Sequence, residues 1–212
     1  MNKIDTLDFY QCYSSTKNMK IKRISFLALI VSLSLFVWTG CKCPCPLVSS
    51  DSGKIPAKYK QGGFAIGCQA YTFKEFTVFE TIEKTAEAGG KVIEFFPGQK
   101  LSKEEPDIKW NHDASEETIA KVKAQLKRHG VFAANYGVVA IPQDEAAARK
   151  IFKFAKKMGL IAITTESEES IDTIEKLVKE YDIKVGFHDH PKRPNNPNYK
   201  MWDPNHVLAL VK

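Results

Sequence analysis

The chain has 212 residues, of which 43% are hydrophobic and 26% are charged, and its formal net charge is +6. This length allows one domain or two, and the composition is that of an ordinary globular protein. The positive charge is mild and belongs partly to the N-terminal segment, and Lys192 and Arg193 form only a small basic patch. Without a basic stripe and interleaved aromatic residues, the composition argues against a nucleic-acid-binding protein.

The first 40 residues have the parts of an export signal. Basic residues at positions 20, 22 and 23 precede an apolar run over residues 24–37, and the small pair Thr39-Gly40 follows just before Cys41. The apolar run is too short to span a bilayer comfortably. Met19 begins a more ordinary signal than Met1 does, so Met19 is a candidate start of translation. We therefore exclude residues 1–40 from the folded domain.

Residues 37–41 resemble a bacterial lipobox. The resemblance implies that Cys41 is lipidated and that the protein is exported and anchored to a membrane, in the periplasm or at the cell surface. Trp38 departs from this motif, which usually has an aliphatic residue there. The alternative is a metal or disulfide cluster of Cys41, Cys43 and Cys45, but no second cluster matches it with zinc spacing. Residues 41–63, rich in Pro, Ser, Gly and Lys, are expected to form a flexible tether.

From residue 64 onward, the sequence repeats a short apolar run, a polar loop, an amphipathic helix and a glycine or tight turn. Helix N-caps are predicted at Asp144 and Asp203. Five such units imply an α/β fold with a parallel sheet, because each helix returns the chain to start the next strand in the same direction. The predicted strands cover residues 64–71, 92–96, 131–136, 160–165 and 185–188.

Two architectures fit this pattern, a doubly wound open sheet and a (β/α)8 TIM barrel. No Gly-x-Gly-x-x-Gly motif or P-loop follows any predicted strand, which weakens the nucleotide-binding version of the open sheet. In a barrel, catalytic residues come from the C-terminal ends of several strands. The polar residues of this chain fall at such positions: Gln69, Tyr71, Glu94, Asn135, Glu166, His188 and His190. The sequence therefore favours a partial barrel of about five strand-helix units over residues 64–212.

Two histidines end the fifth predicted strand, which we expect to be buried. Because side chains alternate along a strand, His188 and His190 share one face and Val185 and Phe187 the other. This spacing suits a common metal ion, a shared anionic substrate group or a proton-transfer pair, although both rings could simply bond to neighbouring loops. A carboxylate such as Glu94 inside an apolar strand is costly unless it is paired.

Three short segments together resemble the sugar phosphate isomerase/epimerase family. They are residues 67–73 (GCQAYTF), residues 92–95 (VIEF) and residues 187–191 (FHDHP), with Trp202 and Asp203 downstream. This xylose isomerase-like TIM barrel group includes inosose dehydratases, tagatose-type epimerases and AP endonuclease-type enzymes. The resemblance implies a divalent metal ion (Mn, Co, Mg or Zn) and a proton moved between adjacent carbons of a sugar or keto-sugar.

The resemblance also implies roles for single residues. In many members the fifth strand ends in Glu-Asn-His, whose glutamate binds the metal; here His188 takes that place, without the negative charge, and His190 matches the histidine. Glu94 matches a glutamate near the substrate. We therefore expect His188 to bind metal and Glu94, Glu166 and His190 to be catalytic, although the acidic run from Glu166 could simply be a solvated loop. Substrate contacts are expected from four residues: Gln69, Tyr71, Asn135 and His112, the last on a loop that could cover the site.

The predicted domain of about 150 residues is shorter than a typical barrel of roughly 250. The family's later strands carry Asp-x-Gly-His, His-x-Lys-Asp and a final glutamate, and these motifs are absent here. We therefore expect the chain to be the front part of a barrel that is active in its full-length form and inactive alone. The alternatives are a non-catalytic sugar-binding or interaction lipoprotein and a keto-inositol-type dehydratase. Nucleic-acid cleavage is disfavoured by export and by the charge pattern.

Overall fold

The structure, a computed structural model, describes residues 53–212. The predicted signal segment 1–40, the predicted lipidation site Cys41 and the first part of the predicted tether lie outside these residues. The remainder of the tether contacts the domain: the 3-10 helix Ala57–Tyr59 places the Tyr59 ring 5.2 Å from the Phe132 ring, and Gln61 Nε2 donates to the Gly89 carbonyl at 3.1 Å. Packed structure therefore begins ahead of residue 64.

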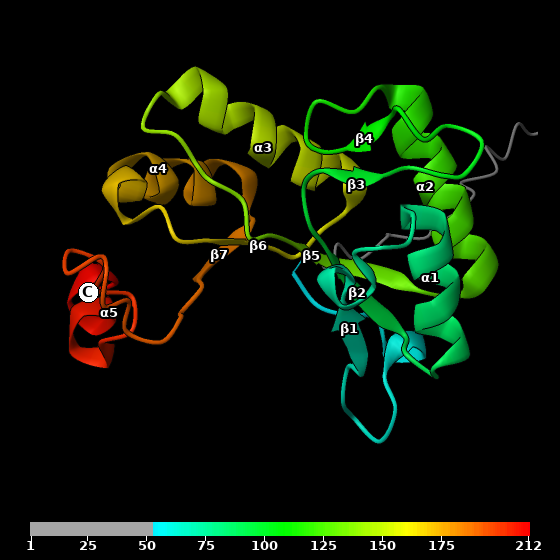
Figure 1. The fold of residues 1–212 in the computed structure, drawn as a ribbon, viewed down its shortest axis with the longest axis horizontal. Coiled ribbons are helices and arrows are strands. Elements are labelled where there is room, and N and C mark those ends of the chain that lie inside the picture. The colour runs from blue at the N-terminus through cyan, green and yellow to red at the C-terminus, as the bar shows by residue number, and fades with distance from the viewer. Residues whose placement is uncertain (1–52) are drawn as a thin grey trace, which may run out of the picture. The chain divides into compact units, whose positions relative to one another are not determined.

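Five parallel strands form one sheet in the order β1-β2-β5-β6-β7 (Figure 1). A doubly wound sheet reverses its strand order partway, whereas a barrel adds each new strand beside the last one. The sequential order therefore selects the (β/α)8 architecture, of which the chain forms a five-stranded part. The strands are β1 (Gly67–Gln69), β2 (Val92–Phe95), β5 (Phe132–Tyr136), β6 (Ala162–Thr165) and β7 (Lys184–Phe187).

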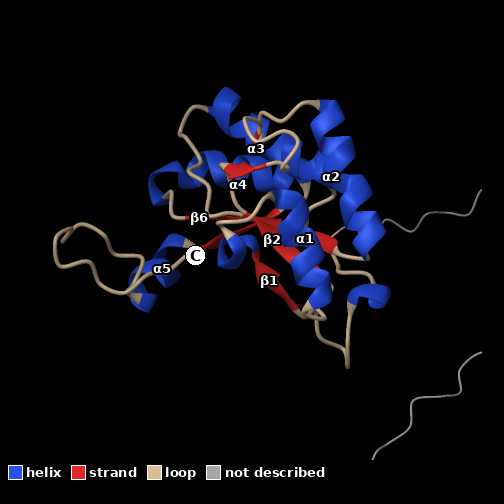
Figure 2. Cartoon of the chain, turned by 45° about the vertical axis from the view of Figure 1, so that its right-hand side comes forward, coloured by secondary structure: helices blue, strands red, loops and turns tan. Residues whose placement is uncertain are grey.

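Five helices alternate with these strands, and Figure 2 shows α1–α4 flanking the sheet. The predicted N-caps are confirmed: Asp144 accepts a hydrogen bond from Ala147 N at 2.8 Å, and Asp203 accepts one from Asn205 N, just ahead of Pro204. Within residues 53–212, no helix is both long and apolar enough to cross a membrane. The helices are α1 (Val78–Glu87), α2 (Glu116–His129), α3 (Glu145–Met158), α4 (Ile171–Tyr181) and α5 (Pro204–Leu210).

Side chains alternate along the strands, so that one face of the sheet carries the hydrophobic core and the other face carries the candidate site. On β2, Ile93 and Phe95 are buried in the hydrophobic core, and Glu94 between them faces the other side. On β6, Ile163 is fully buried in the same core, and the neighbouring Thr164 is only half-buried. The core therefore lies between the sheet and its helices, and the opposite face of the sheet is free to carry polar groups.

The structure corrects the prediction that the fifth strand is buried. Among the residues that the structure describes, strand β7 pairs only with β6 and forms the edge of the sheet, and Lys184 and Gly186 on it are exposed. The predicted orientation still holds, because Val185 and Phe187 pack against the core. The apolar residues of this segment are compatible with a central strand, and equally with an edge strand that packs only one face against the helices. Apolar content alone therefore does not distinguish the two positions.

The predicted loop after the second strand contains two further strands. They are β3 (Gln99–Lys100) and β4 (Lys109–Trp110), which pair with each other in antiparallel fashion. Each is only two residues long, which is too short for an alternating pattern to show in the sequence. Trp110 is fully buried and fixes this pair against the core.

Gly67 lies where strands β1 and β2 approach each other closely. A Cβ atom at this position would come within 1.8 Å of the Val92 carbonyl oxygen, so the backbone would have to move. We expect Gly67→Ala to lower the free energy of unfolding by about 1–3 kcal/mol, the usual cost of overpacking. Urea denaturation measures this. Gly186→Ala is the matched control, because a Cβ at Gly186 meets no atom within 4 Å. Equal stability of the two variants would contradict the close approach.

Candidate functional site

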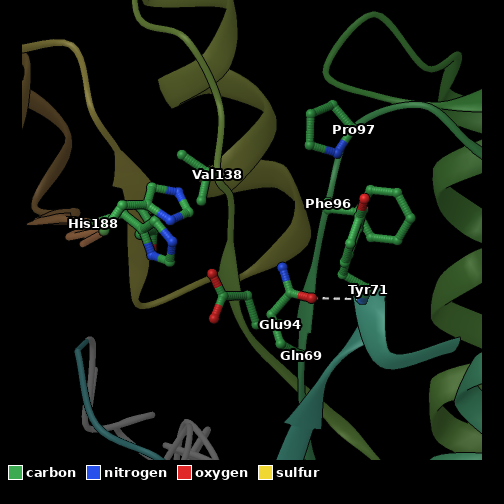
Figure 3. Close-up of a pocket in the computed structure, with 9 residues that line it drawn as sticks. Gln69, Tyr71, Glu94, Phe96, Pro97, Val138 and His188 are labelled. Carbon is green, nitrogen blue, oxygen red and sulfur yellow. Dashed lines mark hydrogen bonds between the residues drawn. The ribbon is translucent and has the colours of Figure 1, made fainter. Parts of the chain in front are cut away.

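A cavity of about 560 Å³ lies at the C-terminal ends of the parallel strands (Figure 3). This is the rim at which the sequence predicted a site. The cavity brings together Gln69 at the end of β1, Tyr71 just after it, Glu94 on β2, and His188 and His190 after β7. The other four residues that line it are Phe96, Pro97, Val138 and Thr164.

Glu94 is the half-buried carboxylate of this cavity. Burial raises the pKa of its carboxyl group, and hydrogen bonds with Thr164 and Asn135 and the nearby His188 offset part of that rise. Asn135 Nδ2 also donates to Thr164 Oγ1 at 2.5 Å, so the two polar groups beside the carboxylate support each other. A carboxylate held in this way, with its pKa moved toward neutrality, is suited to accept and return a proton.

Gln69 and Tyr71 are ordered by local hydrogen bonds at the end of β1. Gln69 Oε1 accepts a hydrogen bond from the Tyr71 backbone N–H at 2.5 Å, and its Nε2 donates to the Gly137 carbonyl at 3.1 Å. The Tyr71 side chain is 56% exposed and meets the Phe96 ring edge-on at 5.2 Å. Figure 3 shows this aromatic pair across the cavity from His188. The cavity thus has an aromatic wall facing an imidazole wall, with Glu94 between them.

Glu166, His188 and His190 form a cluster of possible metal ligands. One ligand atom from each lies within 4.8 Å of the others, the two imidazole rings are 4.7 Å apart, and His190 Nε2 is 2.8 Å from Glu166 Oε1. Two imidazoles and one carboxylate are a donor set that suits Zn, Mn, Co or Fe. The residues present therefore fit the divalent ion that the sequence resemblance implies.

Three of the predicted site residues that the structure describes do not line the cavity. Glu166 lies in the cluster with His188 and His190. Asn135 acts behind it, bonded to Thr164 and in hydrogen-bonding contact with Glu94. His112 lies with its Nδ1 3.3 Å from the hydroxyl of Tyr136, whose ring is fully buried in the core. Burial lowers the pKa of His112, which favours its neutral form at pH 7. Its expected role as a cover over the site remains a prediction.

Sequence reasoning missed several residues at this site. Thr164 could have been found from the alternation of side chains along its strand. It lies on the same face of β6 as Ala162, the face that is turned away from the buried Ile163. Phe96 and Pro97 directly follow β2 and line the cavity, but apolar residues at a strand end do not stand out in the sequence. Arg193 donates from Nη2 to Glu166 Oε2 at 3.1 Å, and no pattern in the sequence links these residues, which are 27 positions apart.

Comparison with known proteins finds similar solved structures and leaves the activity open. No protein-family model matches the chain, and a search of curated proteins also gives no match. An uncharacterized protein of Parabacteroides distasonis ATCC 8503 with a solved structure is 32% identical, with a TM-score of 0.56 over 60% of this chain and 54% of its own. The chain thus spans about half the length of this relative.

Two further solved structures are similar at lower levels. A sugar phosphate isomerase/epimerase from Parabacteroides distasonis ATCC 8503 is 14% identical, with a TM-score of 0.42, over 64% of this chain and 56% of its own. D-psicose 3-epimerase, solved in the presence of D-fructose, is 13% identical, with a TM-score of 0.36, over 55% of this chain and 47% of its own. Because these scores are below 0.5, the barrel assignment rests on the strand order described above.

Proposed function

We propose that the chain belongs to a sugar isomerase or epimerase that moves a proton between adjacent carbons of a sugar or keto-sugar. The observation that carries this proposal is the placement of Glu94, with its raised pKa, in the same cavity as His188 and His190. A proton-transfer group and a candidate cation site then face one substrate-sized space. The sequence resemblance to the sugar phosphate isomerase/epimerase family supports the same reaction class.

In this proposal, Glu166, His188 and His190 hold the divalent ion. Bound there, the ion would polarise neighbouring sugar oxygens and so acidify the carbon-bound proton between them. The cluster shifts the expected roles of Glu166 and His190, because both offer ligand atoms alongside His188. This choice leaves Glu94 as the proton acceptor and donor.

The remaining residues orient the substrate and the carboxylate. Thr164 and Asn135 lie beside Glu94 and favour its carboxylate form, which offsets part of the effect of burial. The Tyr71 and Phe96 rings offer an apolar surface on which the C–H face of a sugar can pack. The same proton removal is also the first half of a dehydration, so a keto-inositol-type dehydratase shares every step up to loss of the leaving group.

One observation favours a second candidate, a non-catalytic sugar-binding lipoprotein. Glu166 is already paired with His190 at 2.8 Å and with Arg193 at 3.1 Å, so the cluster can satisfy its charges without a metal ion. In that case the aromatic wall would bind the sugar, and the histidines would serve as hydrogen-bonding partners.

Metal titration separates the two candidates. We expect the full chain to bind Mn²⁺, Co²⁺ or Zn²⁺, and we expect His188→Ala to weaken that binding by at least about 10-fold, because one nitrogen ligand is lost. Isothermal titration calorimetry measures both. His129→Ala at the end of α2 is the matched control, since His129 does not belong to the cluster. Equal affinity in His188→Ala and the wild type would rule out His188 as a ligand, and a wild type that binds no metal would favour the non-catalytic candidate.

A further inference from the structure

Arg193 lies in the segment between β7 and α5 and reaches back to the metal-ligand cluster. Its Nη2 atom lies 3.1 Å from Glu166 Oε2 and 3.4 Å from Glu166 Oε1. The guanidinium group also stacks on the Tyr199 ring, 3.9 Å from the ring centroid. Arg193 is therefore held from two directions, by the carboxylate of Glu166 and by an aromatic face.

The segment around Arg193 is organised by its own contacts. Asn196 N donates to the Arg193 carbonyl at 3.0 Å, and Tyr199 N donates to the Asn196 carbonyl at 3.1 Å. Trp202 Nε1 donates to the Tyr199 carbonyl at 2.9 Å, and Lys192 Nζ lies 5.2 Å from the Trp202 ring centroid. The turns hold the backbone at Tyr199. Its ring lies 6.5 Å from the His190 ring and limits where the stacked guanidinium group can point.

We propose that Arg193, braced by Tyr199, is a positioning residue that fixes the Glu166 carboxylate for metal binding together with His188 and His190. The inference rests on the proposed function. The Glu166 side chain is long and follows the end of β6, so without a partner it would sample several rotamers. The charge-assisted hydrogen bond is shorter to Oε2, at 3.1 Å, and Oε1 lies 2.8 Å from His190 Nε2. Partners of this kind typically change metal affinity by about 10–100-fold.

The positive charge of Arg193 also has an opposing effect, because it repels a divalent cation. Positioning predicts that removal of Arg193 weakens metal binding, whereas repulsion predicts that removal strengthens it. The Arg193 side chain is 42% exposed, so solvent screens the repulsion, and we expect positioning to dominate. Tyr199→Leu and Arg193→Lys both keep the positive charge and so test positioning apart from repulsion. Because the Tyr199 ring also lies 6.5 Å from the His190 ring, Arg193→Lys is the variant that leaves the surroundings of the imidazoles unchanged.

The test is titration of the full chain with Mn²⁺ at one pH and one salt concentration. Arg193→Met is expected to weaken binding about 10-fold or more, Tyr199→Leu to weaken it in the same direction, and Arg193→Lys to restore it in part, because lysine keeps one donor but lacks the planar fork. Lys200→Met is the matched control, since it removes a positive charge from an exposed position in the same segment, and the ion pairs of Glu166 are with His190 and Arg193.

Two different results would contradict the positioning role of Arg193 and the proposed function. If the wild type binds Mn²⁺ and Arg193→Met binds it equally well or more tightly, the positioning role is overturned and the proposed metal site stands. If the wild type binds neither Mn²⁺, Co²⁺ nor Zn²⁺, the proposed function fails and this inference falls with it. Thermal unfolding of each variant checks that it is folded. If Tyr199→Leu unfolds, the metal affinity of Arg193→Met decides whether the positioning role holds, because the Arg193 side chain is partly exposed and its replacement leaves the core unchanged.

Discussion

Glu94→Gln is expected to lower the rate of substrate proton exchange by about 10²–10⁴-fold, the usual contribution of a general acid or base. Glutamine keeps the size of the side chain and can accept a hydrogen bond from Thr164, but it cannot take up a proton. The measurement is deuterium uptake from D₂O into a panel of ketoses and aldoses, with and without a chelator. It is made on this chain and on any longer product of the gene, because the chain spans about half the length of its solved relatives. Unchanged exchange in the variant would exclude Glu94 as the base.

The same substitution has a second effect that does not depend on knowing the substrate. Burial raises the pKa of Glu94 in the folded protein, so the folded state disfavours the carboxylate relative to the unfolded state. This penalty is absent well below pH 4.5, the ordinary pKa of a glutamate carboxyl group, where both states are protonated, and it grows as the pH rises through the unfolded and then the folded pKa. We therefore expect Glu94→Gln to be more stable than the wild type at pH 7 and equal to it near pH 3.

The expected gain in the free energy of unfolding at pH 7 is about 0.5–2 kcal/mol. Gains of this size are typical when the replaced residue serves function at the expense of stability. Urea denaturation at the two pH values measures it. The exposed residue Glu87 on α1 provides the control, and Glu87→Gln should change stability little at either pH. A Glu94→Gln variant that is less stable than the wild type at pH 7 would show that the hydrogen bonds to Thr164 and Asn135 outweigh the burial.

Local sequence signals predicted the elements because short-range chemistry decides them. Asp144 and Asp203 cap their helices through hydrogen bonds to residues two or three positions ahead, which no distant contact has to arrange. The rim positions of Glu94 and His188 follow from the alternation of side chains in parallel strands. These features are properties of segments of a few residues, and a single sequence contains them.

Features that depend on pairing between distant segments could not be predicted in the same way. The repeated strand-helix pattern alone fits both a doubly wound sheet and a barrel. The polar residues at the strand ends and the family resemblance favoured the barrel, and the strand order, which is set by contacts across the whole sheet, confirms it. The edge position of β7 is another such property. The contact of Arg193 with Glu166 and Tyr199 depends on a segment folded by its own turns, with no repeating pattern to reveal it. The sequence therefore predicts the site residues at the strand ends, such as Glu94 and His188. It does not predict the contacts made by the segment between β7 and α5, such as those of Arg193.

Trp110→Ala is expected to lower the free energy of unfolding by about 3–5 kcal/mol, the range for large aromatic residues removed from a core. Trp110 is fully buried, and its ring meets the rings of Phe95 and Phe154 at 5.6 and 5.2 Å. The loss would take a large share of the roughly 5–15 kcal/mol that stabilises an ordinary domain. Urea denaturation is the measurement, and a cost below about 1 kcal/mol would show that the core closes over the vacated space.

Trp110→Phe tests which part of the side chain matters. Trp110 Nε1 is buried and has no hydrogen-bond partner within the part of the chain that the structure describes, so phenylalanine removes a desolvated donor while it keeps a ring in the core. We expect this variant to lose much less stability than Trp110→Ala. Trp110 also accepts a hydrogen bond at its carbonyl from Gly98 N at 2.8 Å, one residue after Pro97 in the cavity wall. Because the β3–β4 pair ties that wall to the core, loss of the indole should loosen the aromatic side of the cavity before it disturbs the histidines on the opposite side.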